Sequence, residues 1–85
     1  IEEYTSVMII SDRSQEIQKA IVETMGRGVT VLKGTGGYGK RGRQEKELEV
    51  IFSVITRLEL QKLKTEIAKI DENAFVVENS VNDIK

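Results

Sequence analysis

Short runs of β-branched residues alternate with amphipathic helical stretches along this chain, in an order that few folds accommodate. The runs occupy residues 4–10, 29–33, 48–56 and 74–78, and their length and composition are typical of strands. Between the first and second runs, and between the third and fourth, apolar residues recur at helical spacing. The order βαββαβ is that of the ferredoxin-like motif. With right-handed crossovers it predicts an α+β sandwich: one antiparallel sheet, its first and third strands central, with two helices on one face.

Local signals mark where the helices begin and end. Ser11 or Asp12 can cap the first helix, and Gly26 ends it because glycine readily takes the left-handed conformation. Thr56 is followed three residues later by Glu59, which is the spacing of a capping box. We therefore expect the second helix to begin just after Thr56.

The third strand is the clearest of the four and predicts which face of the sheet is buried. Its even-numbered positions are large and apolar: Leu48, Val50, Phe52 and Val54. These side chains share one face of a strand, and we expect that face to pack against the helices. The opposite face carries Ile51 and Ile55, and the first strand is apolar on both faces. A sheet with one face in solvent alternates more cleanly than this, so we expect another chain to cover the second face.

Composition argues against several kinds of site. The 85 residues include no cysteine and no histidine, so disulfides, thiolate or imidazole metal ligands, thiol nucleophiles and histidine bases are excluded. The 13 basic and 14 acidic residues leave a net charge of −1, which provides no overall field for nucleic acid. No triad or phosphate-transfer motif is present. We therefore expect no catalytic residue, no metal, no cofactor and no nucleic-acid partner.

The connection between the second and third strands is the most distinctive segment. Residues 34–44 hold five glycines together with Lys40, Arg41 and Arg43. Glycine lets backbone N–H groups approach an anion, and the cations add charge-assisted hydrogen bonds. No Gly-Lys-Ser/Thr ends the segment and a strand follows it, so it is not a Walker loop. Two interpretations remain: a mobile anion-binding loop in which Tyr38 stacks on a base or partner, or a flexible hairpin loop that Tyr38 anchors.

Three other polar residues have structural interpretations. Arg27 lies at the end of the first helix, where a cation complements the helix dipole. Thr30 lies in a strand, where threonine is a common strand former. Asp71 lies between the second helix and the last strand, where an aspartate typically makes a turn.

Four motifs in order resemble a known family. They are Arg27-Gly28-Val29-Thr30-x-Leu32, Gly34-x-Gly36-Gly37-Tyr38, Glu59-x-x-x-Leu63-Lys64 and Ile70-Asp71-x-x-Ala74-Phe75-Val76. Together they resemble the C-terminal soluble domain of YitT-type bacterial membrane proteins, a domain of unknown function. The likeness extends from residue 9 to residue 77.

The resemblance implies one PII-like domain over residues 1–85. Residues 79–85 are polar, and we expect them to be a frayed tail. It also implies a cytoplasmic domain that follows a multipass region in the bacterial cell membrane, or else a stand-alone relative of such a domain. The chain starts at Ile1 instead of a methionine, and we expect it to be excised from a larger membrane protein.

The resemblance also extends to PII-like signalling domains, whose subunits associate as trimers and bind nucleotides near the base of the loop between the second and third strands. The ligand-binding residues implied here are Thr30, Gly34, Gly36, Gly37 and Tyr38, to which the loop cations Lys40, Arg41 and Arg43 add charge. The chain departs from the family in two places. It has Tyr38-Gly39-Lys40 where Tyr-Thr-Gly is usual, and residues 79–85 lack the closing Gly-x-Gly-Phe segment.

These observations predict a non-catalytic regulatory domain that senses a small anionic ligand, for example a nucleotide, and reports to an attached membrane region. We expect it to be a homo-oligomer, a trimer or a dimer. The alternative is a structural homo-oligomerisation module without a ligand.

Overall fold

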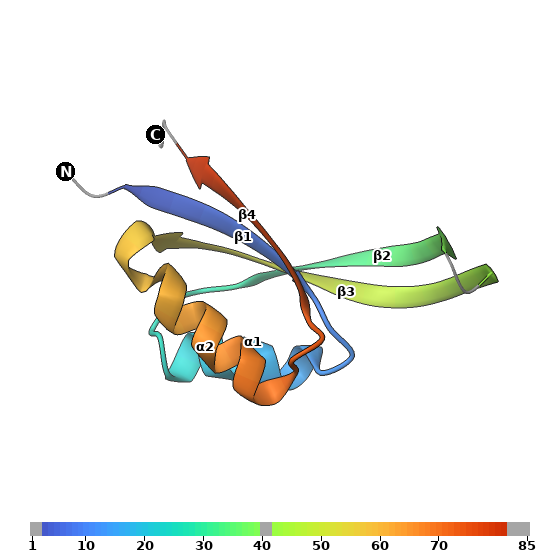
Figure 1. Ribbon diagram of the computed structural model, residues 1–85, viewed down its shortest axis with the longest axis horizontal. Coiled ribbons are helices and arrows are strands. Elements are labelled where there is room, and N and C mark those ends of the chain that lie inside the picture. Colours follow the sequence, from blue (N-terminus) through green and yellow to red (C-terminus); the bar gives the residue numbers. More distant parts are fainter. Residues whose placement is uncertain (1–2, 40–41, 82–85) are drawn as a thin grey trace.

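The computed structural model describes residues 3–39 and 42–81, with side chains described for 3–36 and 46–81. Its elements are β1 (Tyr4–Ile10), α1 (Ser14–Glu23), β2 (Thr30–Gly39), β3 (Gly42–Thr56), the 3₁₀ turn η1 (Arg57–Glu59), α2 (Leu60–Ile70) and β4 (Phe75–Val81). The four strands form one antiparallel sheet in the order β2-β3-β1-β4, and both helices lie on one face of it (Figure 1). The predicted ferredoxin-like sandwich with β1 and β3 central is confirmed.

The core lies between the sheet and the two helices. It consists of eight buried aliphatic side chains: Val7, Ile9, Ile17, Ile21, Ile51, Ile55, Leu63 and Ile67. In register, Ile9 lies opposite Ile51 across β1 and β3, so the central strands supply the sheet side of this core. Burying a side chain of this size contributes roughly 1.5–3 kcal/mol, and these residues therefore provide most of the hydrophobic stabilisation.

The predicted orientation of β3 is wrong. Ile51 and Ile55 are fully buried against the helices and Ser53 is 3% exposed, whereas Phe52 and Val54 lie half-buried on the opposite face. The buried hydroxyl of Ser53 donates to the carbonyl of Gly28 at 2.7 Å, which removes the cost of placing a polar group in the core. Apolar side chains lie on both faces of β3. The sequence pattern of this strand therefore could not show which face packs against the helices.

The face of the sheet away from the helices is rich in apolar side chains. Four of them are clearly exposed, namely Met8, Leu32, Phe75 and Val77, and the strand register places all four on this face. Half-buried neighbours on the same face are Ile10, Val50, Phe52 and Val54. We call these eight residues the open apolar face. The expectation that the sheet is apolar on both faces is confirmed, and its coverage by another chain stays a prediction.

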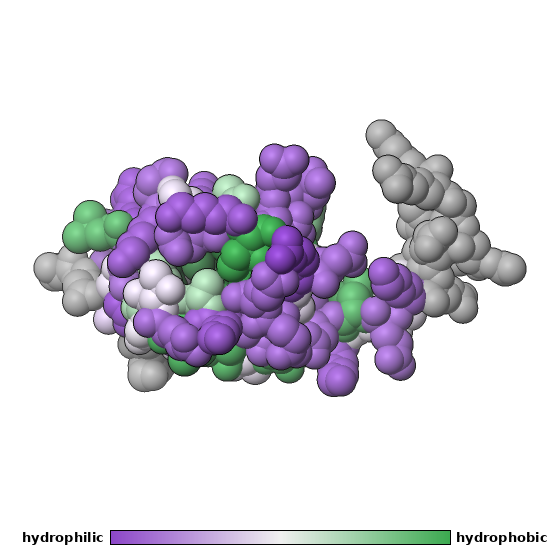
Figure 2. All heavy atoms as spheres, turned by 90° about the horizontal axis from the view of Figure 1, so that it is seen from below, coloured by the Kyte–Doolittle hydropathy of each residue, from purple (hydrophilic) through white to green (hydrophobic). Residues whose placement is uncertain are grey.

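The surface on the helix side differs in character. Viewed from that side, hydrophilic side chains predominate (Figure 2). Two large apolar residues outside the sheet are also exposed, Val22 on α1 and Leu58 in η1. The open apolar face therefore accounts for most of the exposed large apolar side chains that the structure describes.

The predicted loop over residues 34–44 is largely strand. β2 continues to Gly39 and β3 begins at Gly42, with a register shift between Gly36 and Tyr38. Cross-strand pairing satisfies the backbone N–H and C=O groups, so glycines with low strand preference still belong to the hairpin. The hairpin extends well beyond the helices (Figure 1). Residues 40–41 lie outside the described residues.

The predicted helix signals are confirmed in part. Gly26 has φ 67° and ends α1 as expected. Neither Ser11 nor Asp12 caps α1: Arg13 is the N-cap residue, without a side-chain cap bond, and Ser11 Oγ instead accepts a bond from Arg13 N at 2.9 Å. The capping box is present, since Glu59 Oε1 accepts a hydrogen bond from the backbone N–H of Thr56 at 2.9 Å.

The last strand is longer than predicted. β4 continues to Val81, because residues 79–81 pair with residues 4–6 of β1. The expectation of a frayed tail is therefore wrong for residues 79–81, and residues 82–85 lie outside the described residues. Residues 79–81 are mostly polar, so the sequence did not indicate that they pair with β1.

Candidate functional site

A cleft of about 630 Å³ lies where the β1–α1 connection meets the base of the β2–β3 hairpin. Three segments line it: residues 10–14 apart from 13, residues 33–35 of β2 and residues 46–49 of β3. The hairpin continues beyond the end of β1 at Ile10, and its helix-side face forms one wall of the cleft. That face carries Lys33 and Thr35 opposite Glu49 and Glu47.

Two lysines and three carboxylates line the cleft: Lys33, Lys46, Asp12, Glu47 and Glu49. Lys46 Nζ lies 3.6 Å from Asp12 Oδ1, and both side chains are largely exposed. An exposed pair of this kind contributes little, ~0–1 kcal/mol. Lys46 is therefore available to a ligand at small cost.

Glu49 is fixed by the first turn of α1. Its Oε1 accepts hydrogen bonds from Ser14 Oγ at 2.8 Å, from Gln18 Nε2 at 3.4 Å and from Gln15 Nε2 at 3.5 Å. A carboxylate is favourably placed near a helix N-terminus, where the helix dipole is positive. These contacts turn Glu49 towards the helix.

Lys33 lies directly opposite Glu49 in the strand register. Opposite charges at such a position commonly form an ion pair, yet none joins these two side chains, because Glu49 binds α1 instead. Within the described part of the chain, no ion pair or hydrogen bond is found for the Lys33 ammonium. The cleft therefore holds a lysine whose charge no described carboxylate neutralises directly.

Of the three predicted ligand-binding residues whose side chains the structure describes, one lines the cleft. Gly34 lines it, whereas Thr30 and Gly36 do not. Thr30 begins β2 and is exposed on the open face, opposite Phe52, where its interpretation as a strand former is sufficient. Gly36 pairs with Lys46 further along the hairpin.

The structure describes the remaining predicted residues only in part. Gly37, Tyr38 and Arg43 belong to its strands, and their side chains are not among those described. Lys40 and Arg41 lie outside the described residues. The predicted contribution of the loop cations thus stays a prediction.

The sequence reasoning missed Asp12, Ser14, Lys33 and Glu49 as cleft residues. The pattern of polar and apolar residues along the two strands could have indicated Lys33 and Glu49. The polar residues at 33 and 49 continue the strand face whose residues are apolar at 31 and 51. A face that changes from apolar to polar along a strand marks the point where the covering helix ends.

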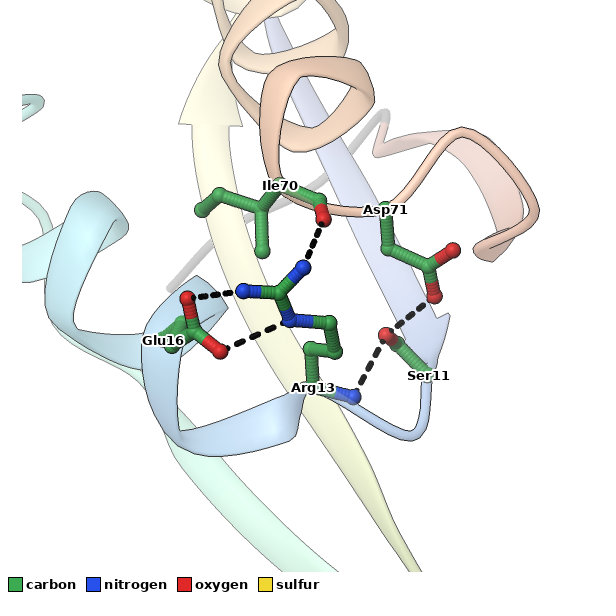
Figure 3. A network of polar contacts seen from close by, with 5 residues as sticks. All are labelled: Ser11, Arg13, Glu16, Ile70 and Asp71. Atoms are coloured by element: carbon green, nitrogen blue, oxygen red, sulfur yellow. Dashed lines mark hydrogen bonds and ion pairs between the residues drawn. The ribbon is translucent and has the colours of Figure 1, made fainter.

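A polar network connects the cleft to the far end of α2 (Figure 3). Ser11 Oγ donates to Asp71 Oδ2 at 2.6 Å, and Arg13 Nη1 donates to the carbonyl of Ile70 at 3.0 Å. Arg13 also binds the carboxylate of Glu16 at 2.6 Å. The hydrogen bond from Ser11, followed by that from the backbone of Asn73, lowers the pKa of Asp71.

The predicted turn at Asp71 is confirmed, because Asp71 Oδ1 accepts a bond from Asn73 N at 2.9 Å. The same carboxylate therefore makes the turn and holds the β1–α1 connection. Since Ser11 lines the cleft, the cleft is linked to the α2–β4 junction by direct contacts.

The fold defines a structural class: it is a PII-like, ferredoxin-like fold with a long hairpin between β2 and β3. CPII bound to ADP and bicarbonate, from Thiomonas intermedia K12, superposes with a TM-score of 0.65 at 17% identity, over 98% of this chain and 91% of that one. A DUF2179 protein from Eubacterium ventriosum superposes with a TM-score of 0.74 at 29% identity, over 89% of this chain and 97% of that one. The predicted PII-like fold is confirmed.

The chain belongs to the DUF2179 family, described as an uncharacterized protein conserved in bacteria, whose model matches residues 27–85. It is 43% identical over 76 residues to the UPF0750 membrane protein YpjC of Bacillus subtilis (strain 168), which covers 89% of this chain and 24% of YpjC. It is 34% identical over 70 residues to YitT of the same organism, covering 82% of this chain and 23% of YitT. The resemblance to YitT-type membrane proteins is confirmed.

The chain spans about a quarter of the length of these membrane proteins. In the described residues, no helix is long and apolar enough to cross a membrane.

Proposed function

We propose that this chain is a non-catalytic regulatory domain of a bacterial membrane protein, that it lies on the cytoplasmic side, and that it binds a small anionic ligand in the cleft. The observation that carries this proposal is the Lys33 ammonium, which lines the cleft without a described partner. A cation without an ion-pair partner gains a charge-assisted hydrogen bond when an anion enters.

A second cation of the cleft supports an anionic ligand. Among the described residues, the ion pair of Lys46 is its exposed contact with Asp12, which a stronger anion can replace.

The ligand class is consistent with a structural neighbour. CPII is a PII-like protein whose structure holds ADP and bicarbonate, both of them anions. We therefore include nucleotides among the candidate ligands.

The polar network of Figure 3 supplies a route by which binding can be reported. Ser11 lines the cleft and binds Asp71, at the junction of α2 and β4. A ligand that displaces the neighbouring Asp12 from Lys46 moves the β1–α1 connection, and this contact passes the movement to the end of α2.

A structural homo-oligomerisation module is the second candidate function, and the open apolar face favours it. Phe75 is 60% exposed and Leu32 is 47% exposed on that face. Contiguous apolar patches of this kind are uncommon on monomers and mark interaction sites. We propose that a second copy covers the face, giving a dimer or a trimer, whether or not the cleft binds a ligand.

A thermal-shift and calorimetric screen with nucleotides and other phosphorylated metabolites tests the sensor function, because binding to the native state raises apparent stability. We expect a ligand that binds more weakly at high salt, and that loses affinity in Lys33→Met but not in Lys19→Met, an exposed lysine on α1. If no phosphorylated compound binds, the sensor proposal fails and the oligomerisation module takes its place.

A further inference from the structure

We infer that the ligand of the cleft is a small zwitterion, whose anionic group binds Lys33 and whose ammonium group binds Glu49. This inference rests on the proposed function, since it concerns the same cleft, and it specifies the chemistry of the ligand. Its basis is the cross-strand pair of Lys33 and Glu49, whose two charges do not neutralise each other.

The two side chains lie directly opposite each other and both line the cleft. Side chains so placed have Cβ atoms about 4.5–5.5 Å apart, close enough for an ion pair. Among the described residues no ion pair joins them. The first turn of α1 prevents it, because Ser14 and two glutamines draw the Glu49 carboxylate away from β2.

All three of these donors bind the same atom of Glu49, Oε1. A carboxylate offers two oxygens and about four lone-pair positions. Within the described residues, Oε2 receives no hydrogen bond. One oxygen therefore anchors the side chain to α1, while the other retains its capacity to accept a hydrogen bond at the cleft.

The charge of the cleft favours a ligand with a positive group. Lys33 and Lys46 are outnumbered by Asp12, Glu47 and Glu49, so the lining carries a net charge of −1. A simple anion gains the attraction of Lys33 but is repelled by the nearby carboxylates. A zwitterion gains both attractions, because its ammonium group replaces the repulsion from Glu49 with a charge-assisted hydrogen bond.

Two probes separate these cases: inorganic phosphate, and O-phosphoethanolamine, which adds an ammonium group to a phosphate. Titration calorimetry on the 85-residue chain should give at least about tenfold tighter binding of O-phosphoethanolamine, corresponding to one charge-assisted contact. Glu49→Gln keeps an oxygen that can accept the bond from Ser14, removes the negative charge, and should abolish this preference. Glu23→Gln, which removes an exposed carboxylate on α1, is the matched control and should retain it.

The comparison on the unmodified chain is decisive even if Glu49→Gln folds poorly. If phosphate binds as tightly as O-phosphoethanolamine, the zwitterion inference is wrong, and the anion site of the proposed function stands. A Glu49→Gln variant that folds and keeps the full preference also overturns the inference. If neither these probes nor any phosphorylated metabolite binds, both the inference and the sensor function are rejected.

Discussion

Arg27 binds Glu59 with its Nη2 2.7 Å from Glu59 Oε1, and so joins the end of α1 to the start of α2. Its Nε also donates to both carboxylate oxygens, at 3.0 and 3.2 Å. The sequence placed Arg27 at the helix end as a dipole partner, and the structure gives it a specific carboxylate. These contacts, together with the backbone N–H of Thr56, lower the pKa of Glu59 to about 2.

This pair predicts how stability depends on pH. The pKa of Glu59 is lower in the folded chain than in the unfolded chain, so its contribution is fully present above the unfolded value of 4.5 and is lost as pH falls towards about 2. Both side chains are about one-third exposed, and we expect a contribution of ~1–2 kcal/mol after screening by solvent.

Glu59→Gln should therefore lower the free energy of unfolding at pH 7 and flatten its decline between pH 4.5 and 2. Chemical denaturation at a series of pH values measures this. Glu72→Gln, an exposed carboxylate in the turn after α2, should leave the pH profile unchanged. An identical acid profile for Glu59→Gln and the unmodified chain would contradict the prediction.

Ile51 is a central core residue, and Ile51→Ala should destabilise the fold by ~2–5 kcal/mol. The side chain is fully buried against Ile9 and the helices, so its truncation leaves a cavity. Val22→Ala is the matched control, because Val22 is 49% exposed on α1, and it should change stability by less than ~0.5 kcal/mol. Equal denaturation midpoints for the two variants would show that the buried face of β3 is assigned wrongly.

The open apolar face should mediate self-association. Leu32→Lys combined with Phe75→Lys places two charges on residues that are already exposed in the monomer, so the chain should stay folded while the oligomer dissociates. Light scattering measures the mass and circular dichroism the fold. The control, Val22→Lys combined with Leu58→Lys, charges two exposed apolar residues outside the sheet and should remain oligomeric. A monomeric mass for the unmodified chain at high micromolar concentration would refute self-association.

Asp12 should act as an internal competitor for the ligand, because it binds the ammonium of Lys46 at 3.6 Å. Asp12→Asn should therefore strengthen phosphate binding by several-fold, and Lys46→Met should weaken it. Both side chains are largely exposed, so neither change should alter stability by more than ~1 kcal/mol. Calorimetric titration at low and high salt checks this, and weaker phosphate binding in Asp12→Asn would be the contrary result.

Most of the residues that line the candidate site could not be predicted from the sequence. The glycines at 34 and 36 were visible as an unusual segment, and Gly34 does line the cleft. Lys33 and Glu49, which carry its charge, lie sixteen positions apart and become neighbours only through the hairpin register. The sequence did not predict that β2 and β3 continue as a long hairpin, because the glycines in this segment are typical of a loop.

The sequence by itself determined the order of the elements, the central position of β1 and β3, the glycine turn at Gly26 that follows α1 and the capping box at Thr56. These features depend on local periodicity and on the backbone preferences of single residues, which a chain carries wherever it folds. Only the tertiary structure decided that Ile51 rather than Phe52 enters the core, because both faces of β3 are apolar and the choice depends on the partners in β1 and the helices. The same holds for the separation of Lys33 from Glu49, which arises because the first turn of α1 competes successfully for the carboxylate.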